Sequence, residues 1–203
     1  MKKSFTLIMF FLVIAAGVNA QKVTFGPLVS GMYNWASYEN GKNWDYRAIG
    51  GYSAGLFFRV KLLKLYIEPE FLYSVRGSDF QQKDNTTGQY NLQSFRYKTI
   101  DVNAMLGLQL FSFADDAVGV RLHTGPGMFF MIDDAFKLND NSLPASEFKK
   151  NVMNWQFGVG LDVTRRLQFD LRYELGLSSL AKDDKIIPKA FMIQVGYKLI
   201  HKK

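Results

Sequence analysis

Residues 167–177 constrain the fold of this chain more than any other segment. The odd positions are all Leu, Phe or Tyr, whereas the even positions are Gln, Asp, Arg, Glu and Gly. Successive side chains of a β-strand point to opposite faces, so every bulky apolar group of this segment falls on one face. Two structures accommodate such a strand: a soluble sheet covered by a second layer, or a membrane barrel with lipid outside and a polar lumen.

The first twenty residues predict a cleaved secretory signal peptide. Lys2 and Lys3 precede an uncharged run over residues 5–18, and Val18-Asn19-Ala20 supplies small residues where a signal peptidase cuts. The run is short for a membrane anchor helix, which needs about 20 apolar residues. We therefore expect a signal peptide at residues 1–20 and one barrel domain at residues 21–203.

Charge and cysteine content exclude several classes of protein. The formal charge of +7 falls to +5 without Lys2 and Lys3, and it is spread along the chain, which argues against a nucleic-acid partner. The chain has no Cys, which excludes disulfides, thiol chemistry and acylation at an N-terminal Cys. Beyond residue 20, no uncharged apolar stretch is as long as a membrane helix. A membrane form of this protein must therefore cross the bilayer with strands.

Eight segments alternate in character and have about the length of a tilted membrane strand. They cover residues 23–35, 46–60, 64–76, 95–111, 117–131, 152–164, 167–177 and 190–200. Three connections are short, at residues 61–63, 112–116 and 165–166. The other four are long and polar, at residues 36–45, 77–94, 132–151 and 178–189. This sorting predicts an all-β, eight-stranded antiparallel up-and-down transmembrane barrel with short periplasmic turns and long extracellular loops.

The apolar face carries no charged residue within the runs of side chains named here. Besides Phe169, Leu171 and Tyr173, it collects Phe25, Val29, Tyr33, Trp35, Tyr52, Leu56, Phe58, Val60, Leu65, Ile67, Phe71, Tyr73, Val75, Ile100, Val102, Leu106, Leu108, Leu110, Val118, Val120, Leu122, Trp155, Phe157, Val159, Leu161, Val163, Phe191, Ile193, Val195, Tyr197 and Leu199. We expect this face to point outward into hydrocarbon.

The opposite face carries six cations and six carboxylates, for which we predict a structural charge network in the lumen. The cations are Arg47, Arg59, Arg76, Arg121, Arg172 and Lys198, and the carboxylates are Glu68, Glu70, Asp101, Asp162, Asp170 and Glu174. Buried charges are tolerated only when they pair, so a balanced set is expected. Many glycines share this face and leave room for the large polar groups of a narrow barrel, which predicts a filled lumen and not an open pore.

Two prolines interrupt the predicted strands. Pro69 and Pro126 each remove a backbone donor from the ladder, so each predicts a bulge or a local break. We expect the bulge at Gly125-Pro126-Gly127.

Four motifs carry a family resemblance that extends over essentially the whole mature chain. They are the runs at residues 68–77 (EPEFLYSVRG), 125–127 (GPG), 158–162 (GVGLD) and 170–177 (DLRYELGL). In this order and spacing they resemble the PorT-type outer-membrane β-barrel family of Bacteroidetes. The resemblance implies an eight-stranded barrel in the outer membrane, in contact with outer-membrane lipid and with the assembly machinery of that membrane. One branch of the family serves a secretion system. The resemblance supplies no catalytic residue and no cofactor.

No motif for catalysis, metal binding or nucleotide binding stands out. His123 shares the inner face with Arg121, and we interpret it as a hydrogen-bonding residue of the lumen. As a general base of a lipid hydrolase it would need a nearby Ser and a carboxylate. Glu68 and Glu70 share their face with six cations, so ion pairing is the expected role. Asp115-Asp116 and Asp183-Asp184 offer too few oxygen ligands for calcium.

Three functions therefore remain open. The first is a non-enzymatic outer-membrane barrel that contacts a protein partner through its extracellular loops. The second is a soluble lipocalin-like barrel, which would turn the apolar face inward around a small apolar ligand. The third is a lipid hydrolase embedded in the barrel. We expect the first, with no cofactor and no metal.

Overall fold

The fold is known from a computed structural model, which describes residues 22–38, 44–83, 90–113, 118–132, 149–182 and 186–202. At residues 38, 44–47, 80–83, 90–95 and 201–202 it describes the backbone alone. The predicted signal peptide lies outside the described residues. Within them, no helix is long and apolar enough to cross a membrane.

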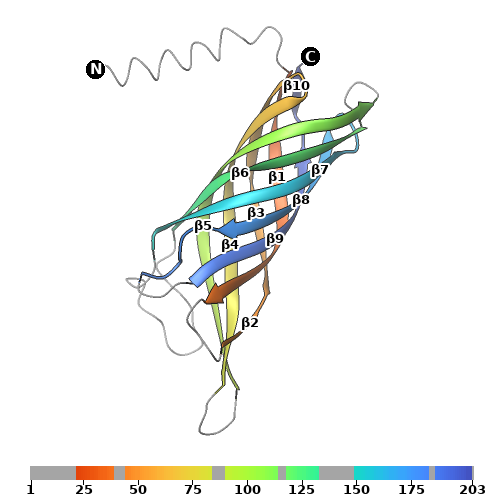
Figure 1. Cartoon of the computed structure of the whole chain (residues 1–203). Coiled ribbons are helices and arrows are strands. Elements are labelled where there is room, and N and C mark those ends of the chain that lie inside the picture. The colour runs from red at the N-terminus through yellow and green to blue at the C-terminus, as the bar shows by residue number, and fades with distance from the viewer. Residues whose placement is uncertain are drawn as a thin grey trace, which may run out of the picture.

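Ten strands make up the sheet. They are β1 (Lys22–Tyr38), β2 (Trp44–Arg47), β3 (Ile49–Leu62), β4 (Leu65–Lys83), β5 (Tyr90–Phe113), β6 (Val118–Met131), β7 (Asn151–Asp162), β8 (Leu167–Gly176), β9 (Ile186–Tyr197) and β10 (Ile200–Lys202). Eight of them form the wall in the order β1-β3-β4-β5-β6-β7-β8-β9, and β9 pairs with β1 to close it. Every pairing is antiparallel between neighbours, so the chain is the closed eight-stranded antiparallel barrel that the alternation predicts (Figure 1).

The first and last described residues lie at the same end of the barrel, which we call the termini end; the opposite end is the far end (Figure 1). Short β10 continues the line of β9 beside β1. β9 places Gly196 opposite Leu28, whereas β10 places Ile200 opposite Phe25, so the register shifts by one residue between them. The two strands therefore act as one strand with a bulge near Lys198.

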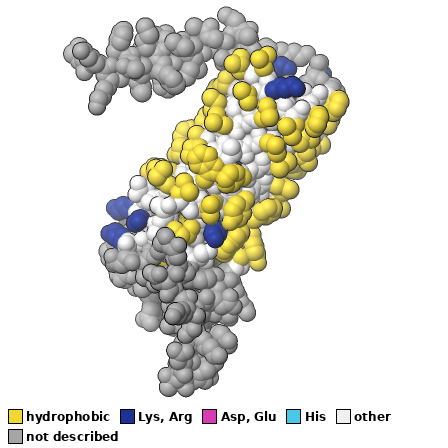
Figure 2. All heavy atoms as spheres, viewed as in Figure 1, with side chains coloured by type: hydrophobic (Ala, Val, Ile, Leu, Met, Phe, Trp, Pro, Cys, Tyr) yellow, Lys and Arg dark blue, Asp and Glu magenta, His cyan; other side chains and the backbone are white. Residues whose placement is uncertain are grey.

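The apolar face points outward. Phe169, Leu171 and Tyr173 are 38%, 50% and 36% exposed, and no residue assigned to the apolar face is buried. Figure 2 shows hydrophobic side chains covering the visible wall, with Lys and Arg gathered at its two ends. A wall of this kind is stable in hydrocarbon, and it confirms the predicted sidedness of the strands. The lipocalin-like alternative requires the reverse orientation and is wrong.

The predicted loop at residues 77–94 is wrong in its extent. β4 and β5 stay paired through this region, from Gly77 opposite Arg96 to Lys83 opposite Tyr90. β2 adds a third strand, with Arg47 opposite Asp79. The Gly, Ser, Asn and Gln residues here are typical of a loop, but backbone ladder bonds form whatever the side chains, so a ribbon extends from the far end (Figure 1).

The bulge predicted at Pro126 is also wrong. The β5–β6 register is the same before and after this proline, from Asn103 opposite Gly127 to Leu106 opposite Thr124. The ladder is interrupted there without an extra residue, because proline removes a donor but leaves the residue count unchanged. The β5–β6 irregularity lies instead between Gln109 and Phe111.

The turn between β3 and β4 contains a strained residue. Leu63 has a φ of 57° in a two-residue hairpin whose flanking pair is Leu62 and Leu65. L-residues rarely adopt this region, and hairpins with positive φ at the first central position favour Gly there. The strain is local to the turn, where Leu63 is 87% exposed.

Candidate functional site

The lumen is lined by the polar face of the strands. On β8, the residues between the outward Leu and Phe groups point inward, and Asp170, Arg172 and Glu174 are at most 1% exposed. Eleven of the twelve charged residues assigned to the inner face are buried there: Arg59, Glu68, Glu70, Arg76, Asp101, Arg121, Asp162, Asp170, Arg172, Glu174 and Lys198. The side chain of the twelfth, Arg47, lies outside the described residues.

The tier of charges nearest the termini end is centred on Asp162. Lys198 Nζ donates to Asp162 Oδ1 at 2.6 Å, and Arg121 Nε lies 3.1 Å from Asp162 Oδ2. Arg121 also donates from Nη2 to Asp170 at 3.2 Å. Beside this group, Arg59 pairs with Glu68 across the β3–β4 hairpin. These contacts tie β7 to β6 and to the chain end, and β6 to β8, so the lumen is cross-linked where the chain closes.

The middle tier joins opposite walls. Arg172 on β8 donates from Nη2 to Glu70 Oε1 at 2.6 Å and from Nη1 to Glu70 Oε2 at 2.8 Å. Its Nη2 also lies 3.4 Å from Glu68. Glu70 accepts a further bond from Asn103 at 3.2 Å. A two-pronged pair of this kind is among the strongest polar contacts in proteins, and it spans the barrel between strands that are not neighbours.

The tier nearest the far end has one cation between two carboxylates. Arg76 donates from Nη1 to Glu174 at 2.5 Å and from Nη2 to Asp101 at 2.7 Å. Asp101 also accepts from the hydroxyls of Ser74 and Thr99, each at 2.6 Å. The Arg76 guanidinium lies 4.7 Å from the centre of the Phe129 ring.

The described lumen holds five cations and six carboxylates, since Arg47 is not among its described side chains. The carboxylates outnumber the cations in the far-end tier, where Arg76 forms ion pairs with both Asp101 and Glu174. Hydroxyl and amide groups donate further hydrogen bonds to these two carboxylates and help to stabilise their negative charge.

Glycines on the inner face provide the room for this network. A Cβ at Gly107 would lie 2.0 Å from the Tyr66 ring, and one at Gly160 would lie 2.3 Å from Asp170 Oδ1. At Gly158 it would lie 2.1 Å from His123 Nε2. Each of these distances is too short for a real methyl group. The glycines therefore leave the space that the large side chains of the lumen occupy.

Sequence reasoning missed the neutral members of the network. Gln156 donates to Asn103 and to Glu174, each at 3.2 Å, and Arg59 donates to Gln168 at 2.8 Å. All of these amides, with Asn154 and Gln194, are at most 2% exposed. The sequence signal that could have identified these amides is their position on the inward-facing side of each strand. The lumen also holds three small apolar clusters, one of which is Leu28, Phe57 and Leu72.

His123 lies in the termini-end half of the lumen. The Tyr66 hydroxyl is 3.2 Å from His123 Nδ1, and Asp170 Oδ1 is 3.6 Å from the same nitrogen. The other nitrogen, Nε2, is buried without a hydrogen-bond partner. The printed contacts of the ring among the described residues are thus a tyrosine and an aspartate, whereas a hydrolase triad pairs the ring with a serine. The described residues do not contain a group of acidic or His side chains that could hold a metal.

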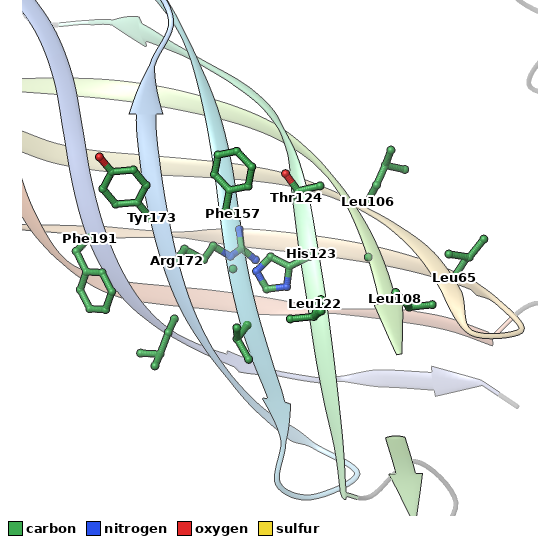
Figure 3. A pocket seen from close by; sticks show the side chains of 14 residues that line it. Leu65, Leu106, Leu108, Leu122, His123, Thr124, Phe157, Arg172, Tyr173 and Phe191 are labelled. Carbon is green, nitrogen blue, oxygen red and sulfur yellow. The ribbon is translucent and has the colours of Figure 1, made fainter. Parts of the chain in front are cut away.

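One hollow of the described surface lies on the outside of the barrel wall. It is a shallow apolar groove on the wall, between two rows of outward residues (Figure 3). One row holds Phe191, Tyr173 and Phe157, and the other holds Leu122 and Leu108. The groove belongs to the lipid-facing wall, and three polar residues, His123, Thr124 and Arg172, also line it.

Comparisons with known proteins agree with this architecture. The family model described as "Outer membrane protein beta-barrel domain" matches residues 4–182. The chain is similar in structure to Ail, the attachment invasion locus protein of Yersinia pestis, solved with the heparin analogue sucrose octasulfate: TM-score 0.50, 13% identity, 88% of this chain and 99% of that chain covered. It is also similar to Neisserial surface protein A: TM-score 0.50, 12% identity, 86% and 97% covered. No curated protein matches its sequence.

Proposed function

Because the chain belongs to the family of outer-membrane protein β-barrel domains, we propose that it is a small non-enzymatic barrel whose filled lumen is a structural core and whose far end contacts a partner outside the cell. The coarse assignment, an outer-membrane barrel, is established by the family and the fold. The partner-contacting role is our proposal.

One observation carries the proposal: the lumen is filled by charges that bind one another. Eleven buried charged side chains link β3 to β8 and Lys198 after β9, and Arg172 with Glu70 crosses the middle. A conducting pore needs an aqueous lumen, and a hydrolase needs a nucleophile beside His123. The described side chains of the interior form neither arrangement, and we infer that contacts with other molecules are made at the ends of the barrel.

The far end suits such contacts. Outer-membrane barrels place short turns at the periplasmic side and longer connections outside. Here the turns at the termini end include the two-residue β3–β4 hairpin. At the far end the ribbon of β2, β4 and β5 extends from the wall (Figure 1). We therefore assign the termini end to the periplasm and the far end to the cell exterior.

Three finer assignments belong to this proposal. The signal peptide at residues 1–20 would export the chain, and the assembly machinery of the outer membrane would insert it. The motifs at residues 68–77 and 170–177 support a place in the PorT-type branch of Bacteroidetes barrels. A protein partner at the far end, in a role associated with secretion as in one branch of that family, completes the proposal.

Conductance and topology measurements test this function. Purified protein folded in a planar bilayer should show no stable channel. In whole cells, a single cysteine at Asp79 on the ribbon should react with a membrane-impermeant maleimide, whereas one at Lys64 in the β3–β4 turn should react only after the membrane is opened. The chain has no Cys, so the labelling background is low. Steady ion conductance, or labelling of Lys64→Cys in intact cells, would overturn the proposal.

A further inference from the structure

A small cavity lies at the far end of the lumen, beside the tier that contains Arg76. It is lined by residues of β1, β4, β5 and β9 and by Leu180, which follows β8. Its volume is about 10 Å³, which is about the smallest space that holds one water-sized group. We propose that this cavity receives the carbonyl oxygen of an uncharged amide from the protein partner. The inference rests on the proposed function, in which the far end faces that partner.

Three buried polar groups line the cavity without a hydrogen-bond partner in the described part of the chain. Asn34, Arg76 and Ser78 are 4%, 3% and 1% exposed. Their unpaired atoms are Nδ2 of Asn34, Nε of Arg76 and the hydroxyl oxygen of Ser78. Buried polar atoms are destabilising unless they form hydrogen bonds, so a ligand atom that bonds to these groups would be bound favourably.

Two of these groups reach the cavity from strands that are not neighbours. Asn34 lies on β1 and Arg76 on β4, with β3 between them. A Cβ at Gly51 of β3 would clash with Asn34 Nδ2, so the missing side chain lets the amide extend across β3 towards β4. The two Nη atoms of Arg76 donate to Glu174 and Asp101, which leaves Nε as its remaining donor. The amide and the guanidinium therefore converge on the same cavity.

The unpaired atoms favour a ligand atom that only accepts hydrogen bonds. Asn34 Nδ2 and Arg76 Nε donate and cannot accept, whereas the Ser78 hydroxyl does both. A water molecule must place two hydrogens of its own, and among the three unpaired atoms only the Ser78 oxygen accepts. A carbonyl oxygen has two lone pairs and no hydrogen, so it complements this set better than water does.

The charges near the cavity favour a neutral ligand over an anion. Of the described residues that line it, Arg76 and Lys189 are cations and none is a carboxylate. Arg76 is already paired with Asp101 and Glu174, at 2.7 and 2.5 Å. Lys189 shares the outward parity of Phe191 on β9, so its side chain points away from the lumen. A third carboxylate would therefore be buried beside two others without a cation of its own, which is costly.

The cavity lies between the closed lumen and the surface of the far end. Leu180 is 1% exposed and packs against Tyr97, Phe129 and Val152, which closes the lumen. Trp35 lines the cavity too and is half-buried, so the cavity borders the molecular surface. An Asn or Gln side chain of the partner is slender enough to bring its carbonyl oxygen into such a space while its stem stays outside.

The test follows side-chain NMR signals of the barrel, folded in neutral detergent, while acetamide is added. Acetate serves as the anionic probe of nearly the same shape, at equal ionic strength. We expect saturable shifts of the Asn34 amide and Arg76 Nε–H signals with acetamide, and smaller shifts with acetate. The Asn154 amide is the internal control, because it is also buried and unpaired but does not line the cavity.

Two serine variants show whether these shifts report binding in the cavity. Ser78→Ala removes one of the three unpaired groups, and we expect about 2–10-fold weaker binding of acetamide, as the loss of one hydrogen bond predicts. Ser53→Ala is the matched control, since Ser53 is 3% exposed on the inner face of β3 and does not line the cavity. Its binding of acetamide should equal that of the wild type.

Four outcomes would overturn the inference. They are the absence of saturable shifts at Asn34 and Arg76, which leaves water as the occupant; equal shifts at Asn154; acetate binding as tight as that of acetamide; and unchanged binding in Ser78→Ala. If Ser78→Ala does not fold, the comparison of Asn34 with Asn154 in the wild type still decides. These readings are made in detergent, so their failure is distinct from a failure of the proposed topology.

Discussion

Arg172 and Glu70 form a two-pronged ion pair across the centre of the barrel, with N–O distances of 2.6 and 2.8 Å between β8 and β4. They are 102 residues apart in the chain and on strands that do not pair with each other. The pair therefore connects opposite walls of the barrel. We expect its loss to lower the stability of the barrel more than the loss of any other contact.

Replacing Arg172 by Met should lower the free energy of unfolding by about 3–5 kcal/mol, because the charge of Glu70 then stays buried without its partner. Adding Glu70→Gln should restore a large part of this loss, since the buried charge is removed as well. Urea unfolding in lipid vesicles measures both. If the double variant is less stable than Arg172→Met alone, the pair is not the source of the effect.

The inner glycines should not tolerate a methyl group. Gly107→Ala would place a Cβ 2.0 Å from the Tyr66 ring, so we expect a loss of about 1–3 kcal/mol in unfolding free energy. Gly31→Ala is the matched control, because a Cβ there meets nothing within 4 Å. Its stability should stay within about 0.5 kcal/mol of the wild type. Equal effects at the two positions would show that packing inside the barrel is looser than the structure has it.

The turn at Leu63 should gain stability from glycine. Leu63→Gly removes the strain of positive φ at a position where the side chain is exposed, and we expect a gain of about 1 kcal/mol. Leu62→Gly, one residue earlier in β3, should instead cost about 0.5–1 kcal/mol. Opposite signs in the two unfolding curves are the expected result; a loss at both positions would contradict it.

A charged side chain on the outer face of the wall should destabilise the barrel more, the deeper it lies in the bilayer. Leu171→Arg should lower the folding free energy in vesicles by about 2–4 kcal/mol if its side chain meets lipid near the midplane. Leu63→Arg, in the exposed turn, should cost no more than about 1 kcal/mol. Equal folding yields of wild type and Leu171→Arg would argue against a lipid-facing wall.

The sequence predicts the strands, their sidedness and their number because a period of two is a local property of each segment. Phe169, Leu171 and Tyr173 alternate with Asp170 and Arg172 whatever their neighbours are, so their faces follow directly. The bulge between Gln109 and Phe111 leaves no such signal, since it depends on how two strands meet. The ribbon beyond Gly77 was missed because polar residues on both faces resemble a loop.

The lumen could be predicted as a set of charges but not as a set of contacts. Parity identifies Arg172 and Glu70 as inward residues, yet their meeting depends on the stagger and closure of the whole wall. Gln156 and Gln168 were passed over because an uncharged amide is common on any polar face, and only burial distinguishes those that bind a carboxylate or guanidinium.

The orientation of the apolar and polar faces is tested most directly by measuring the polarity around two neighbouring side chains of one strand. Spin labels at Ile193→Cys and Gln194→Cys, 54% and 0% exposed, would be compared in vesicles for collision with oxygen, which concentrates in hydrocarbon, and with a water-soluble nickel complex. The account predicts high oxygen contact at position 193 and low contact with either reagent at position 194. High nickel contact at 193, or oxygen contact greater at 194, would contradict a barrel with lipid outside and a packed lumen.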